Sequence, residues 1–176
     1  MGGTHTIWIK PATNKGYDAF GNSEIFQISM GSYVDVFDNY DYDIMDMQCG
    51  MFSACGKGED PLAEGLPIAS NSGGRMTTYL WGGNWTQYKG VTLHAAVKKF
   101  NITLGTGGKY AGLTVQLRVG SVDGPVLAEV TAEDTGWGYK EYTVDCKYGI
   151  VPGAYDFYLV GVGSGKNSNI GTFSLK

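Results

Sequence analysis

Short segments of alternating apolar and polar residues, separated by turn residues, run through the C-terminal two thirds of this chain. Every second position is apolar in 113–119 and 155–159, which is the period of a strand that buries one face. Glycine and proline punctuate the segments, as at 123–125 and 152–153, where they supply a positive φ or a preset turn. With no helical pattern of useful length, the sequence predicts an all-β fold, an antiparallel β-sandwich of the jelly-roll type. Strands are predicted at 91–93, 98–104, 113–119, 126–131, 139–146, 155–162 and 169–175.

The bulk composition supports one turn-rich domain and excludes two kinds of partner. The chain has 176 residues, with 28 Gly, 12 Tyr and 4 Trp, so we expect a single domain over 1–176 with a real core. Its net charge is −4 at pH 7 and its basic residues are scattered, whereas nucleic-acid binding needs a basic stripe. No apolar run approaches the ~20 residues that cross a bilayer. We therefore expect no nucleic-acid partner and no membrane partner.

The N-terminal third has a different pattern. Residues 33–47 alternate acids and aromatics, and residues 48–72 are rich in Gly, Ser, Asn and Pro. The second stretch predicts a long loop, and loops of that length are usually functional or disordered. We therefore expect a loop insertion within 33–72 of the domain. The acids are Asp35, Asp38, Asp41, Asp43 and Asp46.

Such acids suggest calcium binding or hydrolysis, and the sequence favours neither. Calcium wants several carboxylate and carbonyl oxygens, but the spacing in 35–46 lacks the glycine and the closing glutamate of a helix–loop–helix site. A glycosidase needs two carboxylates about 5 to 9 Å apart that face one bond, and nothing selects a pair. Most acidic runs are solvated faces. We expect no catalytic residue, and a small glycoside hydrolase or esterase that uses Asp35–Asp46 remains an alternative.

The cysteines leave two states open. Cys49 and Cys55 could pair in a secreted protein and close a small loop, with Cys146 left free. Three reduced and buried thiols are an equally good interpretation. No metal site is expected, because only His5 and His94 could add ligands to the pair and neither is near in sequence.

Residues 73–88 hold four aromatic side chains among small and polar residues. Tyr79 and Trp81 have the same parity and would share one face of a strand, and Trp85 and Tyr88 follow. A core needs apolar alternation, which the intervening threonines, glycines and asparagine do not supply. Flat rings beside glycines can present their faces to a flat ligand, and the usual such ligand of a glycine-rich β protein is a sugar ring.

The same stretch resembles the Gly-Gly…Tyr-Ile…Gly-Asp-Trp-x-x-Tyr segment of family 6 carbohydrate-binding modules. Tyr79-Leu80 and Asn84-Trp85 fall in register with it. Residues 117–137 resemble the family's Arg-Leu…Asp-Gly-Pro-Leu-Leu…Thr-Gly-Gly-Trp run, and residues 153–173 resemble its closing pair of strands. The resemblance therefore extends in order over about 73–173, and the N-terminal part matches poorly.

The resemblance implies that Tyr79 and Trp137 are two rings that sandwich a sugar in a cleft at the loop end of the sandwich. Trp137 lies between two glycines after a polar run, so its indole is either exposed for binding or folded onto the core. The resemblance also implies that Asn169 hydrogen-bonds the sugar hydroxyls, which suits the donor and acceptor capacity of an amide. Asparagine is also a common turn residue, so Asn169 could instead form a turn. Trp81 could widen the aromatic platform or pack on a neighbouring loop.

The implied function is that of a non-catalytic carbohydrate-binding module. Such a module would be part of a larger, secreted multi-domain enzyme and would tether it to β-linked plant polysaccharide such as xylan, cellulose or mixed glucan. A lectin-like adhesion module is a further alternative. The family often holds a structural calcium through acids on its first and last strands. Here Gly171 stands in place of the last-strand Asp, and Gln27 and Ser29 are the nearest first-strand counterparts. We therefore expect no cofactor, and a structural calcium stays open as the alternative.

Overall fold

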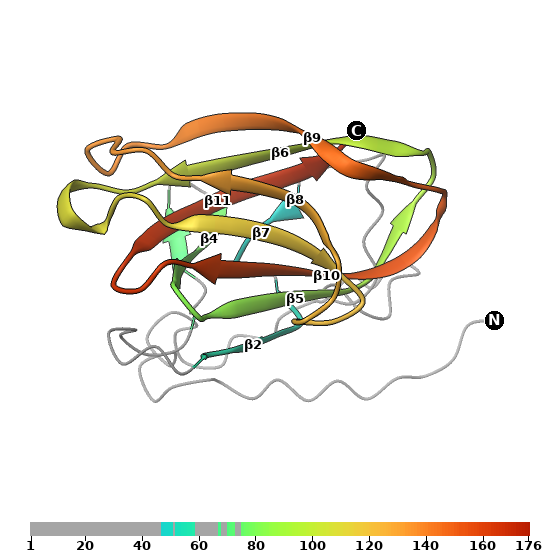
Figure 1. Ribbon diagram of the computed structural model, residues 1–176, viewed down its shortest axis with the longest axis horizontal. Coiled ribbons are helices and arrows are strands. Elements are labelled where there is room, and N and C mark those ends of the chain that lie inside the picture. Colours follow the sequence, from blue (N-terminus) through green and yellow to red (C-terminus); the bar gives the residue numbers. More distant parts are fainter. Residues whose placement is uncertain (1–46, 51, 59–66, 68–69, 73–74) are drawn as a thin grey trace, which may run out of the picture. The chain divides into compact units, whose positions relative to one another are not determined.

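Two antiparallel sheets make up the part of the chain that the computed structural model describes, residues 47–50, 52–58, 67, 70–72 and 75–176 (Figure 1). The described residues belong to one compact unit. The first sheet has the order β3 (Ser70–Ser72), β4 (Arg75–Trp81), β11 (Asn167–Leu175), β6 (Val97–Gly105) and β9 (Lys140–Ile150), and β1 (Met47–Gln48) also pairs with β11. The second has the order β2 (Ala54–Gly56), β5 (Trp85–Leu93), β10 (Gly153–Val162), β7 (Thr114–Val119) and β8 (Val126–Thr131).

One hydrophobic core takes side chains from both sheets. Alternate residues of each strand point into it, such as Val115 and Leu117 of β7 and Ile102 and Leu104 of β6, and all of these are buried. The residues between them face outward and are mostly polar. The sequence pattern predicts this alternation. Because the core takes only the inner faces, the outward side chains of each sheet can contact a ligand.

Three rings from both sheets, the core ring cluster, pack inside this core. Tyr88 of β5 meets Phe173 of β11 edge to face, with ring centroids 4.9 Å apart, and Phe100 of β6 lies 6.0 Å from Phe173. The Tyr88 hydroxyl donates a hydrogen bond to the carbonyl of Cys49 at 2.8 Å. The one polar atom of the cluster is therefore satisfied, as burial requires.

The structure confirms the all-β antiparallel sandwich. The prediction at 91–93 covers only the end of β5, and β4 was not among the predicted strands, because threonines and glycines interrupt the apolar alternation there. Among the described residues, the one helical turn is the short 3₁₀ turn Gly108–Tyr110. No helix within this described part has the length and apolar character needed to cross a bilayer.

Strand β11 contains a bulge. Its pairing with β6 is regular up to Ile170 and resumes at Phe173, so Gly171 and Thr172 both lie opposite Thr103. The Thr103 hydroxyl accepts a hydrogen bond from the Thr172 N–H at 2.8 Å and donates one to the Thr172 carbonyl at 3.3 Å. A side-chain hydroxyl thus replaces the ladder partner that the bulge removes.

Some sequence predictions lie outside the described residues. The acids of 35–46 are among them, as are Gln27 and Ser29. Within 48–72 the structure describes β2 and β3, so part of the predicted loop is strand. The loop insertion within 33–72 stays a prediction.

All three cysteines are free thiols, so the disulfide that the sequence left open is not formed. The Cys49 N–H donates to the carbonyl of Gly171 at 2.9 Å, and the Cys55 thiol donates to the carbonyl of Pro67 at 3.4 Å. Burial raises the pKa of the thiols of Cys49, Cys55 and Cys146 above the ordinary value. Raised pKa values keep these groups as weakly reactive thiols near neutral pH.

Candidate functional site

Tyr79 and Asn169 form a row across the outer face of the first sheet. Tyr79 of β4 pairs with Asn169 of β11, and Asn169 pairs on its other side with Gly105 of β6. Paired residues in antiparallel strands project to the same face, and the adjacent Leu80 and Ile170 are buried in the core, so Tyr79 and Asn169 face outward. Neighbouring strands lie about 4.8 Å apart, so the row from Tyr79 to Gly105 spans roughly 10 Å.

The row continues into the loop between β8 and β9, which carries Trp137. A side chain at Gly105 would meet the carbonyl oxygen of Gly138 at 2.9 Å, so the loop rests directly on β6. The Thr106 carbonyl accepts the N–H groups of Thr135 and Trp137, each at 3.0 Å, and the Thr135 hydroxyl at 2.9 Å. The Thr106 N–H donates back to that hydroxyl at 3.0 Å. The residue that follows β6 therefore fixes the backbone of Trp137.

Trp137 combines a strained backbone with an exposed ring. Its φ is +67°, in the left-handed region that non-glycine residues rarely adopt. Such a conformation costs of order 1–3 kcal/mol and persists only where the surroundings enforce it. The Asp134 carboxylate contributes, because it accepts the N–H groups of Gly136 and Gly108, each at 3.0 Å. The side chain is nevertheless 48% exposed, a combination typical of functional sites.

The indole of Trp137 is the exposed end of three contacting rings, which we term the loop ring cluster. Tyr110 lies in the middle, with its ring centroid 5.9 Å from that of Trp137 and 5.6 Å from that of Trp81. A side chain at Gly107 would collide with the indole of Trp137, so the glycine allows the ring to lie close against the backbone. Trp81 is 5% exposed and Tyr110 is half-buried. The cluster is thus anchored at the end of β4 and open at Trp137.

The structure places Tyr79, Asn169 and Trp137 along one row, where all three are at least partly exposed. Trp81 is different, because its burial against Tyr110 leaves little surface for direct stacking on a ligand. Tyr110 is a residue that the sequence analysis missed. Its position after the glycines at 107 and 108 could have indicated an exposed ring, because neighbouring glycines were also the reason for selecting Trp137.

The charges near this row are paired or engaged with other groups. The Lys109 ammonium lies 5.1 Å from the centroid of the Tyr110 ring, and the Lys166 ammonium donates to the Lys109 carbonyl at 2.9 Å. Lys140 forms an ion pair with Glu133, and that hydrogen bond raises the pKa of Lys140. No run of like charge results, so the arrangement suits a neutral ligand.

The described residues do not fit the structural calcium of the resembling family. None of them form a group of three or more His, Cys, Asp or Glu that could hold a metal. A side chain at Gly171 would collide with the Thr103 hydroxyl and approach the Tyr139 ring at 3.3 Å. The position of the last-strand Asp is therefore closed.

The row offers two aromatic faces with an amide between them. Rings can stack on the apolar faces of a pyranose, and the amide can donate and accept at its hydroxyl rim. The sequence profile of carbohydrate binding module (family 6) matches residues 64–176, which include the whole row and both ring clusters. The chain belongs to carbohydrate-binding module family 6. This family is non-catalytic, so the module binds carbohydrate and is not an enzyme.

No protein with a curated description matches the module in sequence. Solved structures share its fold. A β-1,3-glucan-binding CBM6 from Bacillus halodurans has a TM-score of 0.64 and 20% identity, over 79% of this chain and 99% of its own. CsCBM6-3 from Clostridium stercorarium, in complex with cellobiose, has a TM-score of 0.64 and 18% identity, over 80% and 98%. A family 43 arabinoxylan arabinofuranohydrolase from Bacillus subtilis, in complex with cellotetraose, has a TM-score of 0.59 and 15% identity, over 79% and 28%.

Proposed function

We propose that the module binds β-linked plant polysaccharide by holding a sugar residue between Tyr79 and Trp137, with Asn169 hydrogen-bonded to its hydroxyls. The observation that carries this proposal is the row itself. Strand pairing sets Asn169 beside Tyr79, and Gly105 brings the loop of Trp137 to the other side of Asn169. An aromatic pair that brackets an amide is the arrangement that a sugar, apolar on its faces and polar at its rim, requires.

Tyr110 and Trp81 have a supporting role in this proposal. Trp81 is buried and holds Tyr110 edge to face, and Tyr110 in turn contacts the indole of Trp137. Contacts of this kind contribute about 0.5–1.5 kcal/mol beyond area burial, enough to restrict the rotamers of an exposed ring. Trp81 therefore acts through Tyr110, and its effect on binding is indirect.

The ligand class is xylan, cellulose or mixed glucan in this proposal. The related structures support it, since their descriptions name β-1,3-glucan, cellobiose and cellotetraose. The paired charges around the row also favour an uncharged chain. We place the module in a secreted, multi-domain enzyme that degrades plant polysaccharide. The arabinofuranohydrolase supports this, because the module corresponds to 28% of that longer chain. Tethering raises the local enzyme concentration on the substrate without new contacts at the catalytic site.

Affinity electrophoresis tests the proposal. The module is run through gels that contain xylan, mixed-linkage β-glucan, hydroxyethylcellulose or laminarin, beside Tyr79→Ala, Trp137→Ala and Asn169→Ala. Retardation by at least one polysaccharide, lost in Tyr79→Ala and Trp137→Ala, is the expected result. Tyr148→Ala is the matched control, because it removes another partly exposed tyrosine, 39% exposed, from the far part of β9. Unchanged retardation of both ring variants would refute the cleft.

A further inference from the structure

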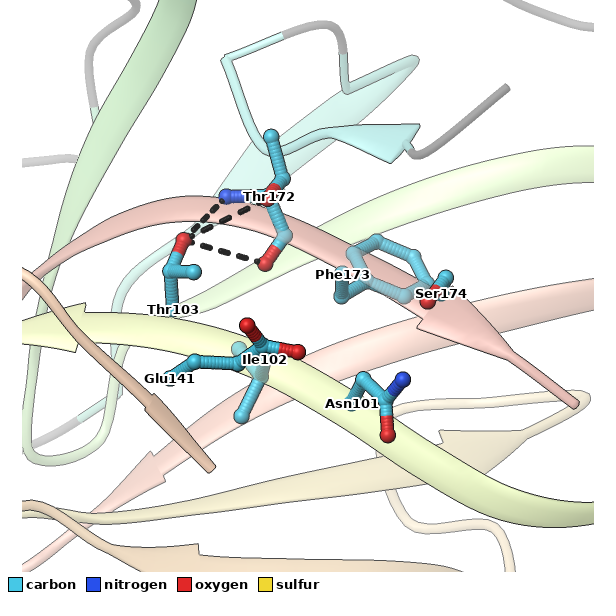
Figure 2. Close-up of a pocket in the computed structure, with 7 residues that line it drawn as sticks. All are labelled: Asn101, Ile102, Thr103, Glu141, Thr172, Phe173 and Ser174. Atoms are coloured by element: carbon cyan, nitrogen blue, oxygen red, sulfur yellow. Dashed lines mark hydrogen bonds between the residues drawn. The ribbon is translucent and has the colours of Figure 1, made fainter. Parts of the chain in front are cut away.

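A concave feature lies on the same outer face, beyond the row. It is a pocket of about 190 Å³ between β6, β9 and β11 (Figure 2). That volume is smaller than the ~300 to 1,000 Å³ of a drug-sized site, so it suits one small ring rather than a long ligand. Its polar walls are Asn101, Thr103, Glu141, Thr172 and Ser174.

The bulge of β11 shapes this pocket. Thr103 and Thr172 hold each other through the hydrogen bonds already described, which Figure 2 shows as dashed lines. Their hydroxyls and backbone form one end of the pocket. Beside them, Gly171 has no side chain, and the Tyr139 ring, 45% exposed, lies against that position. The Thr103 hydroxyl and the Tyr139 ring occupy the space beside Gly171, so the pocket itself begins at Thr103 and Thr172.

Two hydrogen-bonding groups in the pocket have no partner among the residues that the structure describes. The Asn101 Oδ1 atom is buried and accepts no hydrogen bond from them. Glu141 pairs across the strands with Thr103, its carboxylate extends into the pocket, and it has no ion-pair partner among the described residues. A buried amide oxygen without a donor destabilises the protein, and a ligand that supplies a donor removes this cost.

The chemistry of these groups selects the ligand. A carboxylate and an amide oxygen accept hydrogen bonds, while the Ser174 hydroxyl and the Asn101 amide can donate, so the pocket suits vicinal hydroxyl groups. Glu141 disfavours an acidic sugar by like-charge repulsion. A hard cation fits poorly, because calcium takes six to eight oxygens and this pocket offers a single carboxylate.

The position of the pocket relates it to the cleft. Thr103, which lines the pocket, precedes Gly105 of the row by two residues on β6. At about 3.3 Å per residue, a strand advances roughly 7 Å over that distance, so the pocket begins beside the row. We propose that it is a further subsite, which binds a neutral sugar residue of the same polysaccharide through Glu141 and Asn101. This inference rests on the proposed function of the cleft.

Glu141→Gln and Asn101→Ala test the subsite against Asp145→Asn. Asp145 is the matched control, because it is an acid on the same strand and the same face of β9, paired only with the exposed Lys99. Each variant is first checked for unchanged thermal unfolding, and affinity gels are then run with the four polysaccharides. A charged acceptor makes a stronger hydrogen bond than a neutral one, so Glu141→Gln is expected to weaken retardation about five-fold, with Asp145→Asn unchanged.

Ligand length provides a second readout that a structural effect would not change. In titrations with cellobiose, cellotetraose, xylobiose and xylotetraose, Glu141→Gln should weaken the tetrasaccharide bound by the wild type more than the corresponding disaccharide. If Trp137→Ala abolishes binding while Glu141→Gln and Asn101→Ala behave as Asp145→Asn does, the cleft stands and the subsite is wrong. If the wild type is retarded by none of the polysaccharides, both proposals fall.

Discussion

The two ring clusters have nearly the same internal spacing and opposite surroundings. Ring centroids lie 4.9 and 6.0 Å apart in the core ring cluster and 5.6 and 5.9 Å apart in the loop ring cluster. The rings of the first are at most 1% exposed, whereas the second ends in Trp137 at 48%. Ring-to-ring contact is therefore common to both, and what differs is whether the last face is covered. A covered face stabilises the fold, and an open face is available to a ligand.

The clusters are also held in place by different means. In the core, strands from both sheets position the rings, and one hydroxyl bonds to the Cys49 carbonyl. In the loop, backbone hydrogen bonds to Thr106 and Asp134 do the positioning. Changes in the core ring cluster should therefore alter stability, and changes in the loop ring cluster should alter binding.

The largest effect is expected for Phe173→Ala. The ring is 1% exposed and contacts both other members of the core ring cluster, so its loss leaves a cavity between the sheets. The free energy of unfolding should fall by about 3–5 kcal/mol in chemical denaturation. A fall below about 1 kcal/mol would show that the core ring cluster does not stabilise the fold more than the loop ring cluster does.

Trp137→Ala should show the reverse behaviour. Loss of one stacking face should reduce polysaccharide affinity ten-fold or more, which is about 1.4 kcal/mol or more. The free energy of unfolding should fall by no more than about 1.5 kcal/mol, from the lost contact with Tyr110, because the ring is half exposed and the backbone hydrogen bonds remain. Isothermal titration and denaturation of the same sample measure both quantities.

Tyr88→Phe keeps the ring of the core ring cluster and removes its hydrogen bonds. The buried Cys49 carbonyl loses a donor and the Thr86 hydroxyl loses an acceptor, so the free energy of unfolding should fall by about 1 to 3 kcal/mol with unchanged affinity. Tyr142→Phe is the control, because its hydroxyl accepts an exposed hydrogen bond from the Glu133 N–H. Equal losses from the two variants would contradict the role of burial.

The smallest effect is expected for Tyr110→Leu. Leucine keeps apolar volume beside Trp81 but removes the ring that contacts the indole of Trp137. The variant loses both aromatic pairs of Tyr110, and the indole of Trp137 is then less restricted. Affinity should fall about three-fold, and the free energy of unfolding should fall by less than it does for Phe173→Ala. A loss as large as that of Trp137→Ala would instead indicate that Tyr110 touches the sugar directly.

More of the fold than of the candidate site could be predicted from the sequence. Alternation in β7 and β10 predicted strands and their buried faces, because period 2 depends only on local geometry. The bounds of β4 were not predicted, although Tyr79 and Trp81 were expected on one strand face, since Thr77 and Thr78 are buried polar residues that break this pattern. Tyr79 and Asn169 came from a resemblance, and their placement side by side depends on pairing between distant strands, which no local pattern encodes.

The roles of Trp81 and Tyr110 show the same limit. Trp81 looked available because polar and small residues surround it in the sequence. Its burial comes from Tyr110, which a distant turn brings against it. The pocket beside Glu141 was equally hidden, because it depends on a bulge that adds one residue to β11 opposite Thr103. The burial of Trp81, the role of Tyr110 and the pocket all depend on contacts between segments that are distant in the sequence.

The hydrogen bonds at Thr106 also bear on how recognition proceeds in time. They are hydrogen bonds within the protein that fix the loop of Trp137 on the end of β6, so the conformational entropy of that loop is lost when the chain folds. If Trp137 binds the sugar as proposed, the ring is already oriented and no rearrangement has to precede contact. Differences in affinity between polysaccharides then arise mainly from how slowly each one leaves.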